Sequence, residues 1–311
     1  MANFPNTPIF LAGPTAVGKS EIALRLAEQS GGEIITVDSM QVYRGLDIGT
    51  AKPTLAERER VPHHLLDVVD LSEPFDAAKF VTLARTAVKA IQSRNSTPIF
   101  CGGTGLYFKA FLEGLGEAPP SDAALRAELE ATPLRVLLDE LRTRDPATFE
   151  TIDQRNPRRV IRAVEVIRLT GRPFSEQRAA WRHASRITHH ASPLFAFSRP
   201  APDLHHRINA RVDQMFRHGL VEETRRLLEC GLEQNRTAMQ AIGYRQVVEH
   251  LRGERSLEAT VELVKIRTRQ FAKRQLTWFK KHAAPHWLEL TPETSADEIL
   301  TKITALQSCG S

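Results

Sequence analysis

Short apolar runs alternate with amphipathic stretches in the first third of the chain. The runs are four or five residues long and read PIFLA at 8–12, EIITV at 33–37 and PIFC at 98–101. Apolar residues recur with helical spacing at 19–30 and 77–94. Because short apolar strands alternate with helices in this way, the pattern predicts a parallel sheet with crossover helices.

The rest of the chain has a mainly helical pattern. PLFAF at 193–197 is a further strand candidate, and WLEL at 287–290 is a late one. After Pro202 the pattern is helical nearly to the end. We therefore expect an α/β core made of residues 1–117 and 191–311.

The segment between the two parts of the core, residues 118–190, predicts a helical insertion. Ser121 or Asp122 suits the cap of one helix, and Asn156 followed by proline suits the start of another. In the second helix three apolar residues share one face and a glycine ends the pattern; these are Val160, Val164, Ile167 and Gly171.

Composition indicates a globular chain with a modest positive charge. The chain has 311 residues, 41% of them hydrophobic, and a formal net charge of +5. Its three cysteines, Cys101, Cys230 and Cys309, lie far apart with no metal-ligand spacing, which indicates reduced thiols in the cytoplasm. No apolar run approaches the roughly 18 residues that a bilayer requires, so we expect no membrane association. No long apolar seam asks for a partner subunit, so a monomer is the default expectation.

The string GPTAVGKS lies between the first strand and the first helix. It matches the phosphate-binding loop G-x-x-x-x-G-K-[ST] in the context that the motif requires. The predicted diphosphate-binding residues are Gly13, Pro14, Thr15, Ala16, Val17, Gly18, Lys19 and Ser20. Lys19 supplies a point charge, and the Ser20 hydroxyl can hold Mg²⁺. The loop alone leaves the reaction open, since nucleotide hydrolysis, phosphoryl transfer and departure of diphosphate all need such a cradle.

Two further candidates follow predicted strands. Asp38 follows the second strand, at the sheet edge where α/β proteins place their ligands. It can act as a general base or a metal ligand, or it can simply cap a helix. The consecutive glycines of GGTGLY, at 102–107, allow the backbone to approach a ligand closely.

Positive charge is concentrated in two segments. Residues 155–186 contain nine arginines and two acids, and residues 265–281 contain seven lysines or arginines and no acid. Either segment can be a solvated helical face or an RNA-binding surface. Phe271 and Trp278 in the second segment are seven residues apart, and we expect them in the core.

Arg207 and Arg211 are four residues apart on a predicted helix. This spacing can direct both side chains toward a diphosphate or RNA. The alternative is an exposed helix on which Asp203 and Asp213 pair with them. We include Arg211 among the diphosphate-binding candidates.

Seven strings together resemble one known family, the tRNA dimethylallyltransferases, also called tRNA isopentenyltransferases. They occur in the family's order and cover nearly the whole chain: GPTAVGKS, DSMQVYRGLDIGTAKP, HHLLD, GGTGLY, NPRRVIRAVEV, IGYRQ and TRQFAKRQLTWF. The resemblance implies a P-loop NTPase-like parallel sheet with flanking helices and an inserted helical RNA-binding subdomain.

The resemblance also implies an activity and its partners. The family transfers a dimethylallyl group from dimethylallyl diphosphate to N6 of the adenine on the 3′ side of the tRNA anticodon, with Mg²⁺. By this likeness Asp38 is the base and Thr104 lies beside the bridging oxygen of the diphosphate. Lys19 is the third catalytic candidate, because its charge in the phosphate loop can neutralise the leaving diphosphate. The candidate tRNA contacts are Asp38, Ser39, Met40, Gln41, Thr104, Arg126, Arg158, Arg159, Val160, Ile161, Arg162, Gly243, Tyr244 and Arg245.

Two other functions use the same loop. A small-molecule kinase would place ATP there, but it has no evident use for two basic segments. A nucleic-acid-binding ATPase, or an RNA-binding protein without catalysis, would use the basic segments. However, no further apolar strand ending in Asp-Glu is present to position a hydrolytic water.

Overall fold

The structure is a computed structural model that describes residues 7–177, 193–283 and 285–308. The chain forms two compact units, one made of residues 1–109 and 190–311 and the other of residues 110–189. The division falls within helix α4 (Gly105–Glu113), somewhat earlier than the expected boundary at 117/118.

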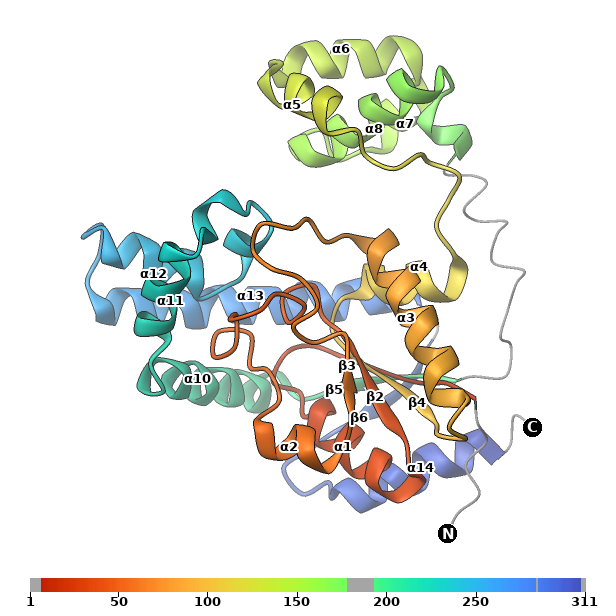
Figure 1. Cartoon of the computed structure of the whole chain (residues 1–311), viewed down its shortest axis with the longest axis vertical. Helices are drawn as coiled ribbons and strands as arrows, with labels where there is room; N and C mark the ends of the chain where they lie inside the picture. The colour runs from red at the N-terminus through yellow and green to blue at the C-terminus, as the bar shows by residue number, and fades with distance from the viewer. Residues whose placement is uncertain (1–6, 178–192, 284, 309–311) are drawn as a thin grey trace. The chain divides into compact units, whose positions relative to one another are not determined.

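The first unit is built on a six-stranded sheet in which every neighbouring pair is parallel (Figure 1). The strand order is β3-β2-β4-β1-β5-β6. The strands are β1 (Ile9–Ala12), β2 (Glu33–Val37), β3 (His63–His64), β4 (Pro98–Gly102), β5 (Leu194–Ser198) and β6 (His286–Glu289). The α/β fold with a parallel sheet is therefore confirmed, and the late strand lies one residue before its expected position.

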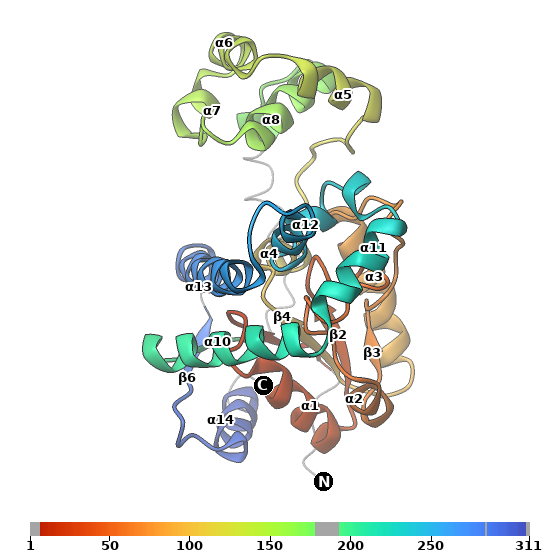
Figure 2. The same ribbon diagram turned by 90° about the vertical axis from the view of Figure 1, so that its left-hand side faces the viewer.

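Helices surround this sheet in the first unit. They are α1 (Lys19–Ser30), α2 (Leu55–Arg60), α3 (Ala77–Gln92), α4, α10 (Ala201–Arg217), α11 (Leu220–Glu229), α12 (Tyr244–Leu251), α13 (Leu257–His282) and α14 (Ala296–Ser308), with short 3₁₀ turns η2 (Leu232–Gln234) and η3 (Ala238–Gln240). Helices α10 and α13 pack against each other, as Figure 2 shows.

Side chains that alternate between the two faces of the sheet build a hydrophobic core on each face. Successive side chains of a strand point to opposite faces. In β1, Ile9 and Leu11 join a buried cluster with residues of α1, α10 and α14. Phe10 points the other way, where its ring lies 4.8 Å from that of Phe100 and 6.5 Å from that of Phe108. A strand buried on both faces needs a continuous apolar run, which is why the sequence pattern identified β1, β2 and β4.

The second unit contains helices α5 (Ala123–Ala131), α6 (Leu134–Arg144), α7 (Pro146–Thr151) and α8 (Pro157–Thr170). Asn156 caps α8 by accepting a hydrogen bond from the Arg159 amide, and Gly171 ends it in a left-handed conformation at φ 72°. Val160, Val164 and Ile167 are buried in this unit's own core. These features agree with the sequence analysis.

A buried acid fixes the loop that follows β2. Glu223 of α11 accepts hydrogen bonds from the Ile48 amide at 2.9 Å and from the Tyr244 hydroxyl at 2.6 Å. The same hydroxyl accepts from the Gly49 amide at 3.1 Å. A Cβ at Gly49 would lie 2.5 Å from the Tyr244 ring, so this close approach requires glycine. The loop is thereby held against α11 and α12.

We expect Tyr244→Phe to lower the free energy of unfolding by about 1–3 kcal/mol, because it removes a buried hydroxyl that bonds on both sides. Thermal unfolding followed by circular dichroism measures the change. Arg245→Ala is the matched control, since its side chain is exposed and pairs only with Glu249 among the described residues. Equal melting temperatures for the two variants would contradict this account.

Candidate functional site

Three loops of the predicted site meet because parallel strands end at the same edge of a sheet. The phosphate loop, residues 13–20, follows β1, Asp38 follows β2, and Gly103 and Thr104 follow β4. A Cβ at Gly102 would lie 2.0 Å from the Val37 carbonyl oxygen, so glycine permits β4 to end close beside β2. The Ser39 amide donates a hydrogen bond to the Thr104 hydroxyl at 3.2 Å.

The phosphate loop leads into a helix N-terminus that no side chain caps. Helix α1 begins at Lys19 after Gly18, whose φ is 108°, and no side chain caps it. The first-turn amides are therefore without a capping side chain, as in an anion-binding helix N-terminus. The Lys19 ammonium donates to the Pro14 carbonyl oxygen at 3.2 Å.

Two arginines outside the loop hold its carbonyl groups. Arg199 follows β5 and donates to the Val17 oxygen at 2.7 Å, while Arg207 of α10 donates to the Ala16 oxygen at 2.9 Å. These contacts fix the direction of two carbonyl groups of the loop. Ala16 is held at φ 62°, a left-handed conformation.

Positive charge at the loop is not neutralised by an ion pair. Within the described parts of the chain, no carboxylate lies within 4 Å of the Lys19 ammonium or the Arg211 guanidinium. Burial lowers the pKa of Lys19, and the Arg211 charge lowers it further. Burial and the neighbouring Arg207 also lower the pKa of Arg211. Two half-buried cations without a carboxylate partner favour an anionic ligand.

The alternative pairing of Asp203 and Asp213 with Arg207 and Arg211 does not form among the described residues. Asp203 pairs with Arg199 at 2.6 Å, and Asp213 pairs with Lys265 at 2.9 Å. Arg211 is instead half-buried at the phosphate loop. Arg211 therefore stays a candidate for diphosphate binding.

Asp38 is half-buried and caps its own turn. Its Oδ1 accepts hydrogen bonds from the Met40 amide at 2.8 Å and the Gln41 amide at 3.3 Å. No donor among the described residues bonds to Oδ2, which leaves that oxygen available to a ligand. Burial raises the pKa of Asp38, although both amides and the Lys19 charge oppose this shift. Asp38 is therefore a turn cap and a candidate base at once.

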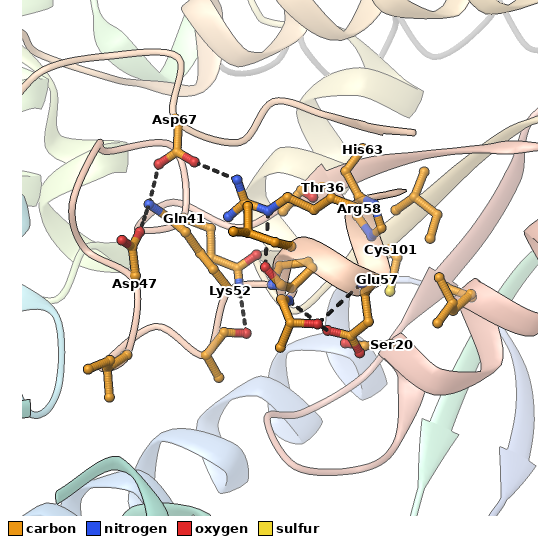
Figure 3. Close-up of a pocket in the computed structure, with 18 of the residues that line it drawn as sticks. Ser20, Thr36, Gln41, Asp47, Lys52, Glu57, Arg58, His63, Asp67 and Cys101 are labelled. Carbon is orange, nitrogen blue, oxygen red and sulfur yellow. Dashed lines mark hydrogen bonds and ion pairs between the residues drawn. The ribbon is translucent and has the colours of Figure 1, made fainter. Parts of the chain in front are cut away.

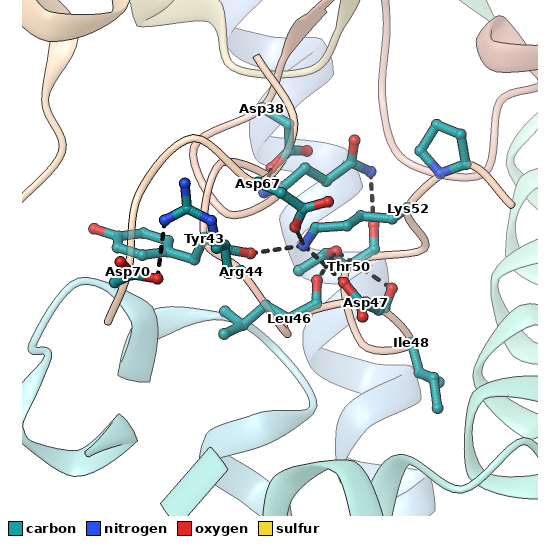
Figure 4. Close-up of polar contacts among 12 residues, drawn as sticks. Asp38, Tyr43, Arg44, Leu46, Asp47, Ile48, Thr50, Lys52, Asp67 and Asp70 are labelled. Carbon is teal, nitrogen blue, oxygen red and sulfur yellow. Dashed lines mark hydrogen bonds and ion pairs between the residues drawn. The ribbon is translucent and has the colours of Figure 1, made fainter. Parts of the chain in front are cut away.

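A buried lysine holds the loop that carries Asp38 (Figure 4). The Lys52 ammonium donates to the Tyr43 carbonyl oxygen at 2.6 Å and pairs with Asp47 at 2.7 Å and with Asp67. Its side chain is only 2% exposed. Arg58 makes a second ion pair with Asp67 at 2.9 Å. The sequence analysis did not identify this network.

A cavity of about 380 Å³ joins the predicted catalytic residues, which we call the inner cavity. Lys19, Asp38, Thr104 and Arg211 all line it. Its apolar wall comes from α10, α13 and the segment before α12, with Val212, Met215, Ile242, Val264 and Phe271. Arg274 also lines the cavity, and the combination of three cations, one carboxylate and an apolar wall suits an anionic ligand that carries a small hydrocarbon group.

A larger cavity of about 920 Å³, the outer cavity, lies between α10 and the loop after β2 (Figure 3). It shares Ser20, Thr36, Gln41, Cys101 and Arg211 with the inner cavity. Burial raises the pKa of the Cys101 thiol to about 11, so this sulfur is a neutral wall and not a nucleophile. The two cavities therefore meet at the phosphate loop.

The candidate RNA contacts of the second unit differ in exposure. Arg158 and Arg159 are exposed, whereas Val160 and Ile161 are buried and hold α8 in its core. Arg126 and Arg162 both donate to the buried Glu165, at 3.3 and 2.7 Å. Of the nine arginines expected in this basic segment, Arg178, Arg182 and Arg186 lie outside the described residues.

The three candidate tRNA contacts at 243–245 do not line the inner cavity, and two of them have structural roles. Tyr244 is fully buried against Glu223, so its side chain is structural. Gly243 provides the turn before α12 at φ 105°. Arg245 is exposed and pairs with Glu249.

The expectation that Phe271 lies in the core is wrong. Its side chain is 37% exposed and lines the inner cavity together with Arg274 and Gln275. The buried aromatic residue of this helix is Phe279, whose ring lies 6.0 Å from that of Phe108. The seven-residue spacing places Phe271 and Trp278 on one face of α13, but it does not indicate that Phe271 borders a cavity and not the core.

Among the described residues, no three His, Cys, Asp or Glu side chains are grouped as a metal would require. In the same part of the chain, none of the helices combines the length and apolar content of a membrane span.

Comparison with known proteins gives one consistent result. The family model for IPP transferase matches residues 41–282. The chain is 46% identical to a protein of Trichlorobacter lovleyi named tRNA dimethylallyltransferase 1, over 93% of this chain and 95% of that protein. It is 45% identical to the tRNA dimethylallyltransferase of Geobacter sulfurreducens, over 90% and 91%.

Solved structures give the same result. The full-length tRNA isopentenylpyrophosphate transferase of Bacillus halodurans superposes with a TM-score of 0.72 at 37% identity, covering 98% of this chain and 97% of that one. A eukaryotic dimethylallyltransferase described as acting on tRNA superposes with a TM-score of 0.82 at 28% identity, over 97% of this chain and 80% of that one. With a family model that spans most of the sequence and relatives above 40% identity over nine tenths of it, the chain belongs to the IPP transferase family.

Proposed function

We propose that this chain transfers a dimethylallyl group from dimethylallyl diphosphate to N6 of the adenine on the 3′ side of a tRNA anticodon. The observation that carries the proposal is the inner cavity, which places Lys19 and Arg211 in one space with Asp38 and Thr104. Its apolar wall suits the five-carbon group. The names of the relatives support the same donor and acceptor.

The reaction needs charge stabilisation at the leaving group and a base at the nucleophile. An exocyclic amine is a weak nucleophile because its lone pair is delocalised into the ring. As the N6–C1 bond forms and the C1–O bond breaks, the N6 proton passes to the Asp38 carboxylate. The electron pair of the broken bond leaves with diphosphate, which the loop amides, Lys19 and Arg211 stabilise.

Thr104 completes the proposed site on the acceptor side of the diphosphate. Its hydroxyl accepts from the Ser39 amide and retains its own proton for donation. That proton can reach the bridging oxygen of the donor. Release of diphosphate is thereby assisted without a charged acid.

Mg²⁺ fits this site as a companion of the diphosphate. Mg²⁺ usually keeps several waters and binds through one or two protein oxygens plus substrate phosphates. Ser20 is exposed at the start of α1 and lines both cavities, which suits one such oxygen. When bound, the ion would offset charge on the leaving diphosphate.

RNA recognition is proposed for the exposed arginines of the second unit and for α13. Arg158 and Arg159 suit phosphate contacts, and Phe271 with Arg274 offers a stacking surface at the inner cavity. The target adenine must leave its stack to reach Asp38. A cytoplasmic location is proposed with it, since tRNA and reduced thiols occur there.

The kinase alternative is not favoured. It assigns no role to the exposed arginines of α8 or to the apolar wall beside Asp38. The RNA-binding ATPase alternative also leaves that wall unexplained. Membership of the family gives a role to each feature.

The direct test is incubation of the purified chain with tRNA, Mg²⁺ and dimethylallyl diphosphate, followed by mass spectrometry of the nucleosides. We expect adenosine that carries one five-carbon group, at the position next to the anticodon. A control reaction replaces the donor with ATP. Unmodified tRNA together with ATP turnover would overturn the proposal in favour of a kinase or an ATPase.

We expect Asp38→Asn to lower kcat/KM by about 10²–10⁴-fold while the melting temperature at neutral pH stays equal or rises. Burial raises the pKa of Asp38, so the folded protein favours the neutral acid and the ionised carboxylate costs stability above that pKa. The asparagine side chain keeps an oxygen that accepts the hydrogen bond from the Met40 amide, and it removes the negative charge of the carboxylate.

The matched control is Asp70→Asn, which changes an exposed acid paired with Arg44. For the unmodified chain, kcat/KM should fall as the pH decreases through the pKa of Asp38. An Asp38→Asn variant with full activity would exclude the base assignment.

We expect the double variant Arg158→Ala/Arg159→Ala to weaken tRNA binding and to reduce the slope of log K against log salt by about 1.5. Filter binding at several salt concentrations measures both. Arg135→Ala/Arg142→Ala removes the same charge from exposed positions on α6 of the same unit and should leave the slope unchanged. Equal slopes for both double variants would argue against RNA contact by α8.

A further inference from the structure

A buried glutamine joins two loops of the site that are far apart in sequence. Gln275 of α13 is 8% exposed, and both ends of its side-chain amide are used. Its Oε1 accepts a hydrogen bond from the Thr15 amide in the phosphate loop at 2.9 Å. Its Nε2 donates to the Gly103 carbonyl oxygen after β4 at 3.0 Å.

The contact with Gly103 depends on the absence of a side chain there. A Cβ at Gly103 would lie 2.2 Å from Nε2 of Gln275 and 3.1 Å from the Gly13 carbonyl oxygen. The glutamine amide thus occupies the space that any other residue at 103 would need. Glycine at this position is required for the approach of the amide and not for a turn.

The hydrogen bonds continue from Gly103 to the candidate base. Thr104 follows Gly103 directly, and its hydroxyl accepts from the Ser39 amide at 3.2 Å. Ser39 follows Asp38, whose Oδ1 accepts from the Met40 amide. A continuous path therefore runs from the diphosphate-binding loop through Gln275 to the turn that holds Asp38.

We propose that Gln275 is a positioning residue that sets the spacing between the diphosphate-binding loop and the Asp38 turn. This inference rests on the proposed function, because the two loops carry the leaving group and the base of that reaction. In this role Gln275 acts through the Thr15 amide and the Gly103 carbonyl group and takes no part in the bond changes. Its effect is on the alignment of the two reacting groups.

The chemistry makes that spacing important. Displacement at an allylic carbon requires the amine, the carbon and the leaving oxygen to be nearly in line, and a misplacement of about 1 Å can cost about 10²-fold in rate. A backbone amide and a backbone carbonyl clamped by one planar side chain have little freedom to separate. The clamp comes from α13, which also places Phe271 and Arg274 on the wall of the inner cavity.

The test uses Gln275→Ala, Gly103→Ala and the double variant in the full chain, with steady-state dimethylallyl transfer to tRNA. We expect each single variant to lower kcat by about 10–10²-fold, with KM for tRNA changed less than about threefold. The double variant should lose no more than Gly103→Ala alone, because both changes break the same clamp. The proposal would be overturned if the loss of kcat in the double variant equalled the product of the two single losses. A rise in KM with kcat unchanged would overturn it as well.

Gln275→Glu gives a second readout that a packing role would not produce. A protonated glutamic acid can accept from Thr15 and donate to the Gly103 oxygen, as glutamine does, whereas its carboxylate cannot donate. The activity of this variant relative to the unmodified chain should therefore increase as the pH is lowered. A ratio that does not change with pH would contradict the clamp.

Thr277→Ala is the control, since Thr277 is exposed on the same helix and its hydroxyl bonds only to the Lys273 carbonyl oxygen among the described residues. Melting temperatures show whether each variant is folded.

If the unmodified chain transfers no dimethylallyl group, the proposed function fails. Calorimetric binding of Mg²⁺-diphosphate then still tests the clamp, which predicts weaker binding by Gln275→Ala than by Thr277→Ala. If the unmodified chain is active and Gln275→Ala matches it, the clamp alone fails.

Discussion

The unneutralised positive charge at the phosphate loop is the constraint on which the rest of the site depends. Lys19 and Arg211 are brought together at the end of β1 without a carboxylate within ion-pair distance in the described residues. Even partial burial of unpaired cations costs free energy, because it removes part of their hydration. The loop must therefore be held in shape by contacts elsewhere, which Arg199 and Arg207 provide through its carbonyl groups. An anionic ligand then supplies the missing countercharge.

The same constraint links the base to the leaving group. Burial lowers the pKa of Lys19 and raises that of Asp38, so each group loses part of its tendency to be charged. Diphosphate beside Lys19 would raise the lysine pKa again. Its negative charge would also raise the pKa of Asp38 further and make the carboxylate a stronger base. Binding of the donor would therefore strengthen the base on the acceptor side.

Local sequence was sufficient wherever the physical cause is local. The apolar runs of β1, β2 and β4 identified buried parallel strands, and the Asn156 cap with Gly171 marked both ends of α8. The loop motif identified Lys19 and Ser20. The two-residue strand β3 lacks such a signal, because His63 and His64 form no apolar run and their strand exists only through pairing with β2.

The contacts that were not predictable join residues far apart in the chain. Gln275 reaches Thr15 across 260 positions, and nothing in TRQFAKRQLTWF distinguishes it from a surface glutamine. In the sequence Glu165 is one of two acids in an arginine-rich segment. In the fold it is buried and forms ion pairs with both Arg126 and Arg162. Phe271 had the spacing of a core residue, whereas the face it occupies meets a cavity. Only the assembled fold decides these three cases.

A phosphate loop by itself does not determine which bond is broken, since it stabilises charge on a phosphate group in any reaction. The outcome depends on what faces the bound phosphates. In this chain the inner cavity offers a carboxylate with one oxygen committed to the Met40 and Gln41 amides and the other available, next to an apolar wall. A water or sugar nucleophile gains nothing from that wall, whereas a carbon group between the loop and Asp38 is shielded by it. We infer that the apolar side of the cavity, more than the cradle, favours alkyl transfer over phosphoryl transfer.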